Sequence, residues 1–275
     1  MSFRVIFELA PPREPNLRKV LRQIEVFAPI VHAFLVPDNH LGQPAISSLA
    51  IALEVQARGL SPIVALNARD RNRLRLRSDL LTLQAYGVQE VLFLYGDPVE
   101  GQRCGLTVRQ MLNDDAGDGL RRGVVATIGK PLGWRAAADF LVTRLDLAGP
   151  PADFRPVSGS GVRPIYCGTL ALAGAEIARK VLANLPNLAP PPGYLEAFDH
   201  DDEAGFHAAL ESLDHLRRSG IDGAHLVVPA RRRRFARLLE SWMADRNLLE
   251  GGSGAAAGER YDLLRHRGPG SPAEH

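Results

Sequence analysis

Short apolar runs that alternate with helical patterns are the feature that most restricts what this chain can fold into. Eight such runs have the composition of buried parallel strands, at 5–8, 33–36, 62–66, 90–94, 124–128, 140–144, 164–167 and 224–228. Helical patterns are expected at 16–26, 47–58, 72–86, 107–112, 173–184, 202–219 and 231–245. This alternation is typical of a parallel sheet joined by crossover helices, either closed or open. Eight strand candidates favour the closed form, an α/β fold of the (β/α)8 TIM-barrel type.

Two connections in the second half are poor candidates for crossover helices. About a dozen residues separate the fifth and sixth runs, and they include Gly129, Pro131 and Gly133. A parallel crossover with its helix usually needs at least about 10 to 12 residues. The next connection, 145–163, is rich in proline, glycine and serine. We therefore expect a barrel with abbreviated crossovers after strands five and six.

Length and composition indicate one soluble enzyme-sized domain. The chain has 275 residues, 45% of them hydrophobic, which suffices for one full core. We expect a barrel domain at 1–249 and a disordered tail at 250–275, where glycine, alanine, serine and proline dominate. No internal repeat is visible.

Charge and cysteine content exclude several classes of protein. The formal net charge is +2, from 33 basic and 31 acidic residues, so no strong field favours nucleic acid or a membrane surface. Two cysteines without paired spacing indicate neither a disulfide framework nor a zinc site, and no metal site is expected. The basic residues gather at 69–77 and at 231–234. The four consecutive arginines at 231–234 are expected to be a solvated helix start, with phosphate or polyglutamate binding as the alternative. No secretory leader or spanning segment is apparent, so we expect a cytoplasmic protein.

Two carboxylates follow expected strands at the end of the barrel where reactive groups gather. Glu8 ends the first run, and Asp97 follows the fourth run after Gly96. The carboxyl ends of barrel strands surround the mouth, so both side chains are candidates for catalysis. The structural alternative is that Glu8 caps a backbone group and Asp97 shapes a turn.

Other polar residues follow neighbouring strands on the same rim. Asp38 and Asn39 come after the second run, and each is equally suited to capping a helix. Thr143 and Arg144 end the sixth run, where an arginine is a candidate partner for a ligand carboxylate. Lys130 follows the fifth run. The scattered histidines, His225 among them, show no metal-like grouping and are expected on the surface or in the core.

Absent motifs narrow the range of functions. The chain has no Gly-x-Gly-x-x-Gly turn, no phosphate-binding loop and no Gly-x-Ser-x-Gly elbow. A nucleotide-binding crossover and a serine hydrolase are therefore not expected.

Several stretches, in order along most of the first 230 residues, resemble the methylenetetrahydrofolate reductases. They are Phe-Glu-Leu-Ala-Pro-Pro at 7–12, Asp38 with Gly42, and the stretches 68–72, 78–81, 86–92, 96–98 and 137–144. The resemblance implies an eight-stranded barrel that uses flavin (FAD) and a reduced nicotinamide, NAD(P)H, to convert a tetrahydrofolate in one-carbon metabolism and methionine biosynthesis. The implied reaction is reduction of 5,10-methylenetetrahydrofolate to 5-methyltetrahydrofolate, an oxidoreductase activity.

The resemblance also implies roles for individual residues. Glu8 would be the acid that opens the bridged one-carbon ring, since a carboxyl group in an apolar setting favours its neutral form. Asp97 would hydrogen-bond the pterin, and Thr143 and Arg144 would bind substrate. Cofactor contacts would come from Asp38, Asn39, Tyr95, Gly96 and Lys130.

The chain departs from the family's pattern mainly where the flavin is held. Ala65 replaces a histidine, Tyr95 replaces an arginine or threonine, Arg144 replaces a glutamine, and Ala175 stands at the expected phenylalanine. The loop and helix that grip the flavin phosphates would lie between strands five and six, where this chain is short. The alternative is therefore a flavin-free folate-binding paralogue, which transfers the one-carbon unit or serves as a non-catalytic subunit. Missing helices would expose apolar surface on strands five and six, so we expect a homo-oligomer or a partner subunit there.

Overall fold

Eight parallel strands close into a barrel in chain order, and β8 pairs with β1 to complete it. The computed structural model describes residues 3–39, 42–97, 99, 105–127, 130–147, 161–162, 164–185 and 188–249. The strands are β1 (Arg4–Glu8), β2 (Ala33–Val36), β3 (Pro62–Asn67), β4 (Glu90–Leu94), β5 (Arg121–Ala126), β6 (Phe140–Asp146), β7 (Ile165–Leu170) and β8 (Gly223–Val227). The predicted TIM barrel is confirmed.

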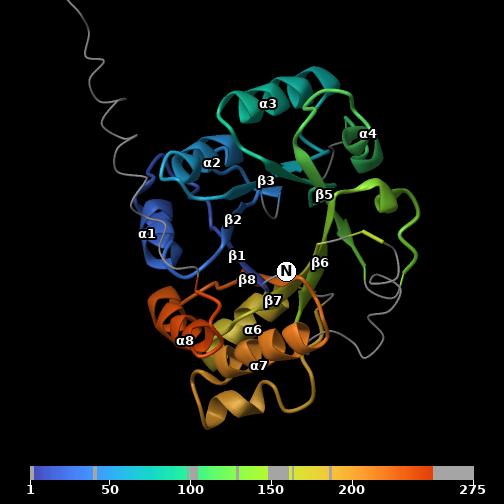
Figure 1. The fold of residues 1–275 in the computed structure, drawn as a ribbon. Helices are drawn as coiled ribbons and strands as arrows, with labels where there is room; N and C mark the ends of the chain where they lie inside the picture. Colours follow the sequence, from blue (N-terminus) through green and yellow to red (C-terminus); the bar gives the residue numbers. More distant parts are fainter. Residues whose placement is uncertain are drawn as a thin grey trace, which may run out of the picture.

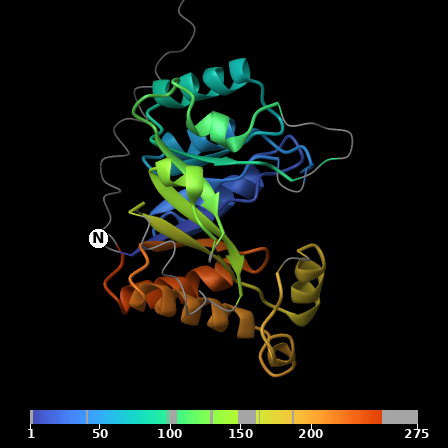
Figure 2. The ribbon, with the colours of Figure 1, turned by 90° about the vertical axis from the view of Figure 1, so that its right-hand side faces the viewer.

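Helices lie around the outside of this barrel (Figure 1). Within the described residues they include α1 (Arg18–Phe27), α2 (Ser48–Gln56), α3 (Arg73–Ala85), α4 (Val108–Leu112), α6 (Ala175–Ala183), α7 (Ala204–Arg218) and α8 (Arg232–Ala244), with the 3-10 helices η2 (Gly133–Ala137) and η3 (Glu196–Asp199). Figure 2 shows that α6 and η3 extend beyond the carboxyl end of the barrel. Among the described residues, no helix combines the length and the apolar character needed to cross a bilayer.

In its described residues, the connection from β5 to β6 contains the short η2 and no α-helix, which confirms the abbreviated crossover expected there. The connection from β6 to β7 falls mostly outside the described residues, as does the tail at 250–275. β5 begins at Arg121, earlier than expected, because Arg121 faces the interior and pairs with Glu90. Sequence reasoning missed η3, which follows the proline-rich stretch at 188–193.

Side chains alternate between the barrel interior and the layer beneath the helices, as parallel strands require. Ile6, Leu35, Ile63, Leu92 and Val142 belong to the interior group. Their strand neighbours pack instead against the surrounding helices. At the amino end of the strands the interior is closed by polar groups, where Glu90 pairs with Arg4 at 2.7 Å and with Arg121 at 2.8 Å.

The apolar flank expected on β5 and β6 is absent from the described part of the molecule. Val124, Ala126 and Leu141 point outward, yet each is fully buried. Leu132 and Ala138, on either side of η2, are buried with them in the same cluster. The expectation of exposed strands was wrong because this short connection covers them without an α-helix.

Candidate functional site

Glu8 lies at the carboxyl end of β1 and is held there by His225 of β8. The Oε2 atom of Glu8 is 2.8 Å from Nε2 of His225. Strand register explains the contact, because His225 pairs with Ile6 and shares its interior face, and Glu8 lies two residues further along that face. The Glu8 side chain is 17% exposed and that of His225 is 8% exposed. Glu8 is therefore oriented by the protein and still open to a ligand.

Sequence reasoning missed His225, which it assigned to the surface or core. Alternation along β8 was the available signal, since it places Gly223, His225 and Val227 on one face. That pattern does not reveal that the face meets Glu8. The contact depends on closure of the barrel between residues 217 positions apart.

Asp97 follows β4 at the same end of the barrel and is half-buried. Its loop is fixed by Arg69, whose Nη1 donates to the Asp97 carbonyl oxygen at 2.5 Å. Arg69 is itself held by the carboxylate of Asp70, at 2.6 Å from Nε and 2.7 Å from Nη2. The hydrogen bonds from Arg69 keep the pKa of Asp70 well below its usual range. The structure thus gives the Asp97 loop a rigid support.

Gly96 allows the same loop to lie close to β3. Its φ of +81° favours glycine, and a Cβ there would come within 3.1 Å of the Asn67 Cβ. Tyr95, directly before it, is 48% exposed. A side chain at position 96 would displace the loop that carries Asp97.

Asp38 and Asn39, expected to contact a cofactor, bond instead within the chain. Asp38 is buried and accepts hydrogen bonds from the backbone N of Asn67 at 3.0 Å, from Asn67 Nδ2 at 2.6 Å and from Arg71. Asn39 donates to Asp70 at 3.0 Å and accepts from the backbone N of Ala45. These contacts favour a structural role in joining β2 to β3.

Thr143 and Arg144 end up in different environments. Thr143 is buried and accepts from the backbone N of Gly168 at 3.0 Å, where the β6–β7 register shifts. Arg144 is exposed, and no described residue pairs with its guanidinium. Lys130 is also exposed. Of the residues expected to bind substrate, Arg144 is the one whose charge is available.

The two basic runs are largely neutralised by acidic partners inside the chain. In the first run, Arg71 pairs with Asp38 and Asp79, and Arg73 and Arg77 both bind Asp114. In the second, Arg231 pairs with Asp202 and Arg234 with Glu203. Arg231, Arg233 and Arg234 are exposed at the start of α8, in agreement with the expected solvated helix start.

The described residues of the β5–β6 connection do not fit a flavin dinucleotide. Arg135 donates Nε to the Val125 carbonyl at 3.0 Å and stacks over Trp134, so its charge is used locally. Lys130 is the other cation of the described connection, and η2 is a 3-10 helix of only five residues. Two phosphates would need several charge-assisted hydrogen bonds, each contributing roughly 1.5 to 3 kcal/mol. We derive no chemical step through a flavin.

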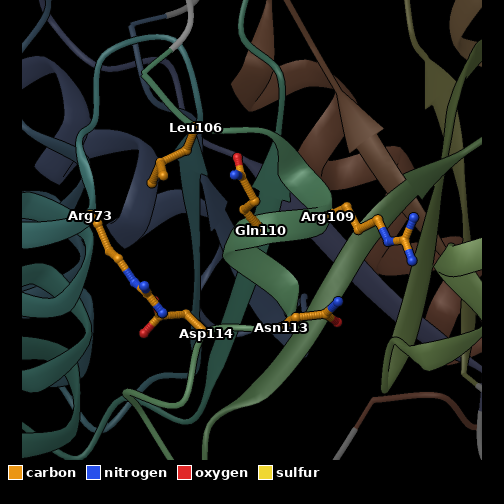
Figure 3. Close-up of a pocket in the computed structure, with 6 residues that line it drawn as sticks. All are labelled: Arg73, Leu106, Arg109, Gln110, Asn113 and Asp114. Carbon is orange, nitrogen blue, oxygen red and sulfur yellow. The ribbon is translucent and has the colours of Figure 1, made fainter.

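A separate cleft of about 290 Å³ lies between α3 and α4, away from the interior of the barrel (Figure 3). It is lined by Arg73, Leu106, Arg109, Gln110, Asn113 and Asp114. Figure 3 shows Arg73 and Asp114 turned toward each other across it, in keeping with their 2.8 Å ion pair. The cleft contains none of the residues expected to carry chemistry. No group of three or more histidine, cysteine or acidic residues in the described parts of the chain could hold a metal ion.

Comparisons with known proteins support the fold. No family model matches the sequence, and no curated protein matches it. Among solved structures, a Clostridium thermocellum protein that binds two copies of 5-methyl-5,6,7,8-tetrahydrofolic acid aligns with a TM-score of 0.63 at 11% identity, over 87% of this chain and 96% of that one. EDTA monooxygenase from Chelativorans sp. BNC1 aligns with a TM-score of 0.57 at 13% identity, over 95% and 98%. At these identities the likeness establishes the barrel alone.

Proposed function

We propose that this chain binds a tetrahydrofolate and reduces its 5,10-methylene form to the 5-methyl form. The observation that carries the proposal is Glu8, a partly exposed carboxyl group held by His225 at the carboxyl end of β1. The structural neighbour that binds 5-methyltetrahydrofolic acid supports a folate ligand for this kind of barrel. The sequence stretches shared with the reductase family support the reaction.

The reaction assigns a proton to Glu8. The bond between the bridging carbon and N10 breaks, N10 takes a proton, and the carbon becomes an iminium group on N5. Addition of a hydride to this carbon would give the 5-methyl product, and a reduced nicotinamide, itself oxidised in the step, would supply that hydride. A carboxyl group at the barrel mouth is suited to deliver the proton. Asp97, on its fixed loop, would hydrogen-bond the pterin.

Arg144 fits the acidic end of such a ligand. Tetrahydrofolate carries a glutamate with two carboxylates, and a guanidinium binds a carboxylate through two parallel hydrogen bonds. Arg144 is exposed at the carboxyl end of β6 and has no partner among the described residues. Its position supports a role in holding the glutamate.

A second candidate is a flavin-free protein that binds the folate and either transfers the one-carbon unit or acts as a subunit of a complex. The short β5–β6 connection favours it, because the described residues there do not fit a flavin dinucleotide. The visible spectrum and a binding titration separate the two. Stoichiometric flavin absorbance supports a flavoenzyme, whereas a colourless protein that binds tetrahydrofolate without turning over the methylene form supports the second candidate.

Cellular location and assembly are further parts of the proposal. The low cysteine content supports a cytoplasmic protein, which cell fractionation tests. A homo-oligomer or a partner subunit remains our prediction, and light scattering of the purified protein measures the state directly. A protein that binds no folate and co-purifies with another subunit would favour a non-catalytic role.

Changing Glu8 to Gln tests the proposed reaction. The substitution keeps the shape and removes the transferable proton, so turnover should fall by about 100-fold or more. Binding of 5-methyltetrahydrofolate, followed by calorimetry, should change little because the amide still fills the site. Glu14→Gln is the matched control, since its side chain is 75% exposed on the surface. Unchanged turnover in Glu8→Gln would remove Glu8 from the mechanism.

A further inference from the structure

We propose that His225 is a positioning residue, which fixes Glu8 through a hydrogen bond from Nε2–H to Oε2 and leaves Oε1 as the oxygen that carries the transferable proton. The inference rests on the proposed function for its catalytic consequence. Its structural part, the tautomer of His225, stands on the contacts alone.

The tautomer follows from the two ring nitrogens. Nε2 lies 2.8 Å from Glu8 Oε2, whereas Nδ1 is buried and has no hydrogen-bond partner in the described structure. The residue as a whole is 6% exposed. A proton on Nδ1 would therefore be a buried donor without an acceptor, which costs free energy. Of the two single-proton tautomers, the one with its proton on Nε2, directed at Glu8, is therefore the lower in energy.

The two Glu8 oxygens are consequently unequal. Oε2 accepts from the ring, and no described residue bonds to Oε1. A proton taken up by Glu8 on Oε2 would displace the ring proton to Nδ1, into the unpartnered position. A proton taken up on Oε1 leaves the hydrogen bond to His225 intact. When Glu8 is protonated, its O–H group therefore lies on Oε1. The side chain is 17% exposed.

The remaining neighbours supply no competing donor for Oε2. On β2, Glu8 pairs with Leu35, which is apolar. The strand partners of His225 are Gly168 on β7, which has no side chain, and Ile6 on β1. At the amino end of the strands, the interior charges of Arg4 and Arg121 both pair with Glu90. His225 is therefore the side chain within the described barrel that sets the orientation of Glu8.

Nitrogen NMR of the imidazole rings tests the tautomer without any need for activity. The protein has 8 histidines, and the His225 signals are identified by their absence in His225→Phe. We expect the tautomer with its proton on Nε2 in the wild type, and a loss of this preference in Glu8→Ala. A ring protonated on Nδ1, or a doubly protonated ring, would overturn the inference.

Kinetics of paired variants test the positioning role. His225→Phe keeps ring bulk without a donor, so kcat should fall by about 10- to 100-fold while KM changes little. His225→Gln retains an N–H donor and should recover most of the loss. Equal kcat in the two variants, with both folded by circular dichroism, would contradict positioning. If the wild type shows no turnover, the proposed reduction fails, and the NMR result still decides the tautomer.

Discussion

At the scale of single residues, the hydroxyl group of Tyr194 is a buried polar group that lacks a hydrogen bond to any described residue. Tyr194 is 7% exposed, and its hydroxyl has no hydrogen-bond partner in the described structure. It packs edge-on against Phe198 at 5.6 Å between ring centroids. Burial raises the pKa of Tyr194 to about 12. The hydroxyl therefore contributes little to stability at neutral pH and costs stability once the unfolded chain ionises.

We predict that Tyr194→Phe unfolds at an equal or higher urea concentration than the wild type at pH 7. The raised pKa of Tyr194 also determines how the stability of the wild type changes with pH. The unfolded tyrosine ionises near 10 and the folded one near 12, so the wild type loses stability as pH rises between these values. Tyr194→Phe should lose less over the same interval. A parallel decline of the two proteins would show that the hydroxyl finds a partner.

Sequence reasoning could locate a site residue when its position along a strand already determines the end of the barrel at which it lies. Glu8 and Asp97 follow apolar strands, and in a barrel such residues meet at one end. His225 could not be paired with Glu8 in this way, because the contact needs the register of two strands from opposite ends of the chain. Asp38 had the right location, yet its partners Asn67 and Arg71 were beyond sequence reasoning.

At the scale of elements, strands were predictable because they are apolar, and irregular segments were not. The start of β5 at Arg121 escaped prediction since its charge is neutralised only across the barrel, by Glu90. The helix α3 shows the same limit, because its first turns are rich in arginine and look solvated. In the folded chain, Arg73 and Arg77 bind Asp114, which follows α4.

Asp114→Asn tests how far this contact ties α3 to the segment after α4. Burial alone would raise the pKa of Asp114, but bonds from the backbone N of Ala116 and from Arg73 and Arg77 lower it to about 2. The carboxylate thus adds stability above its ordinary pKa, which is lost as pH falls from about 4 to 2. The variant should be less stable by about 1 to 3 kcal/mol at pH 7 in urea unfolding. The stability of the variant should also decline less than that of the wild type as the pH falls. An equal decline in acid would show that Asp114 does not have the lowered pKa.

At the scale of the whole molecule, the proposed function assigns stability to one end of the barrel and ligand binding to the other. The amino end is closed by Glu90, which bonds Arg4 of β1 and Arg121 of β5 and so links strands across the interior. The carboxyl end holds Glu8 and His225, a pair that is partly open. In barrels of this type, residues at the amino ends of the strands generally serve stability, and residues at the carboxyl ends serve chemistry.

Glu90→Gln should therefore weaken the fold and spare ligand binding, the reverse of Glu8→Gln. Removing the charge leaves Arg4 with Tyr166 as its other polar partner, at 3.1 Å, inside the barrel. Breaking a largely buried ion pair lowers the free energy of unfolding by about 3 kcal/mol. The loss is smaller for a partly exposed arginine such as Arg121. Urea unfolding should show this loss, while folate affinity measured below the transition stays close to that of the wild type. A variant that kept full stability but lost folate binding would place the ligand at the amino end, and the carboxyl-end site would then be wrong.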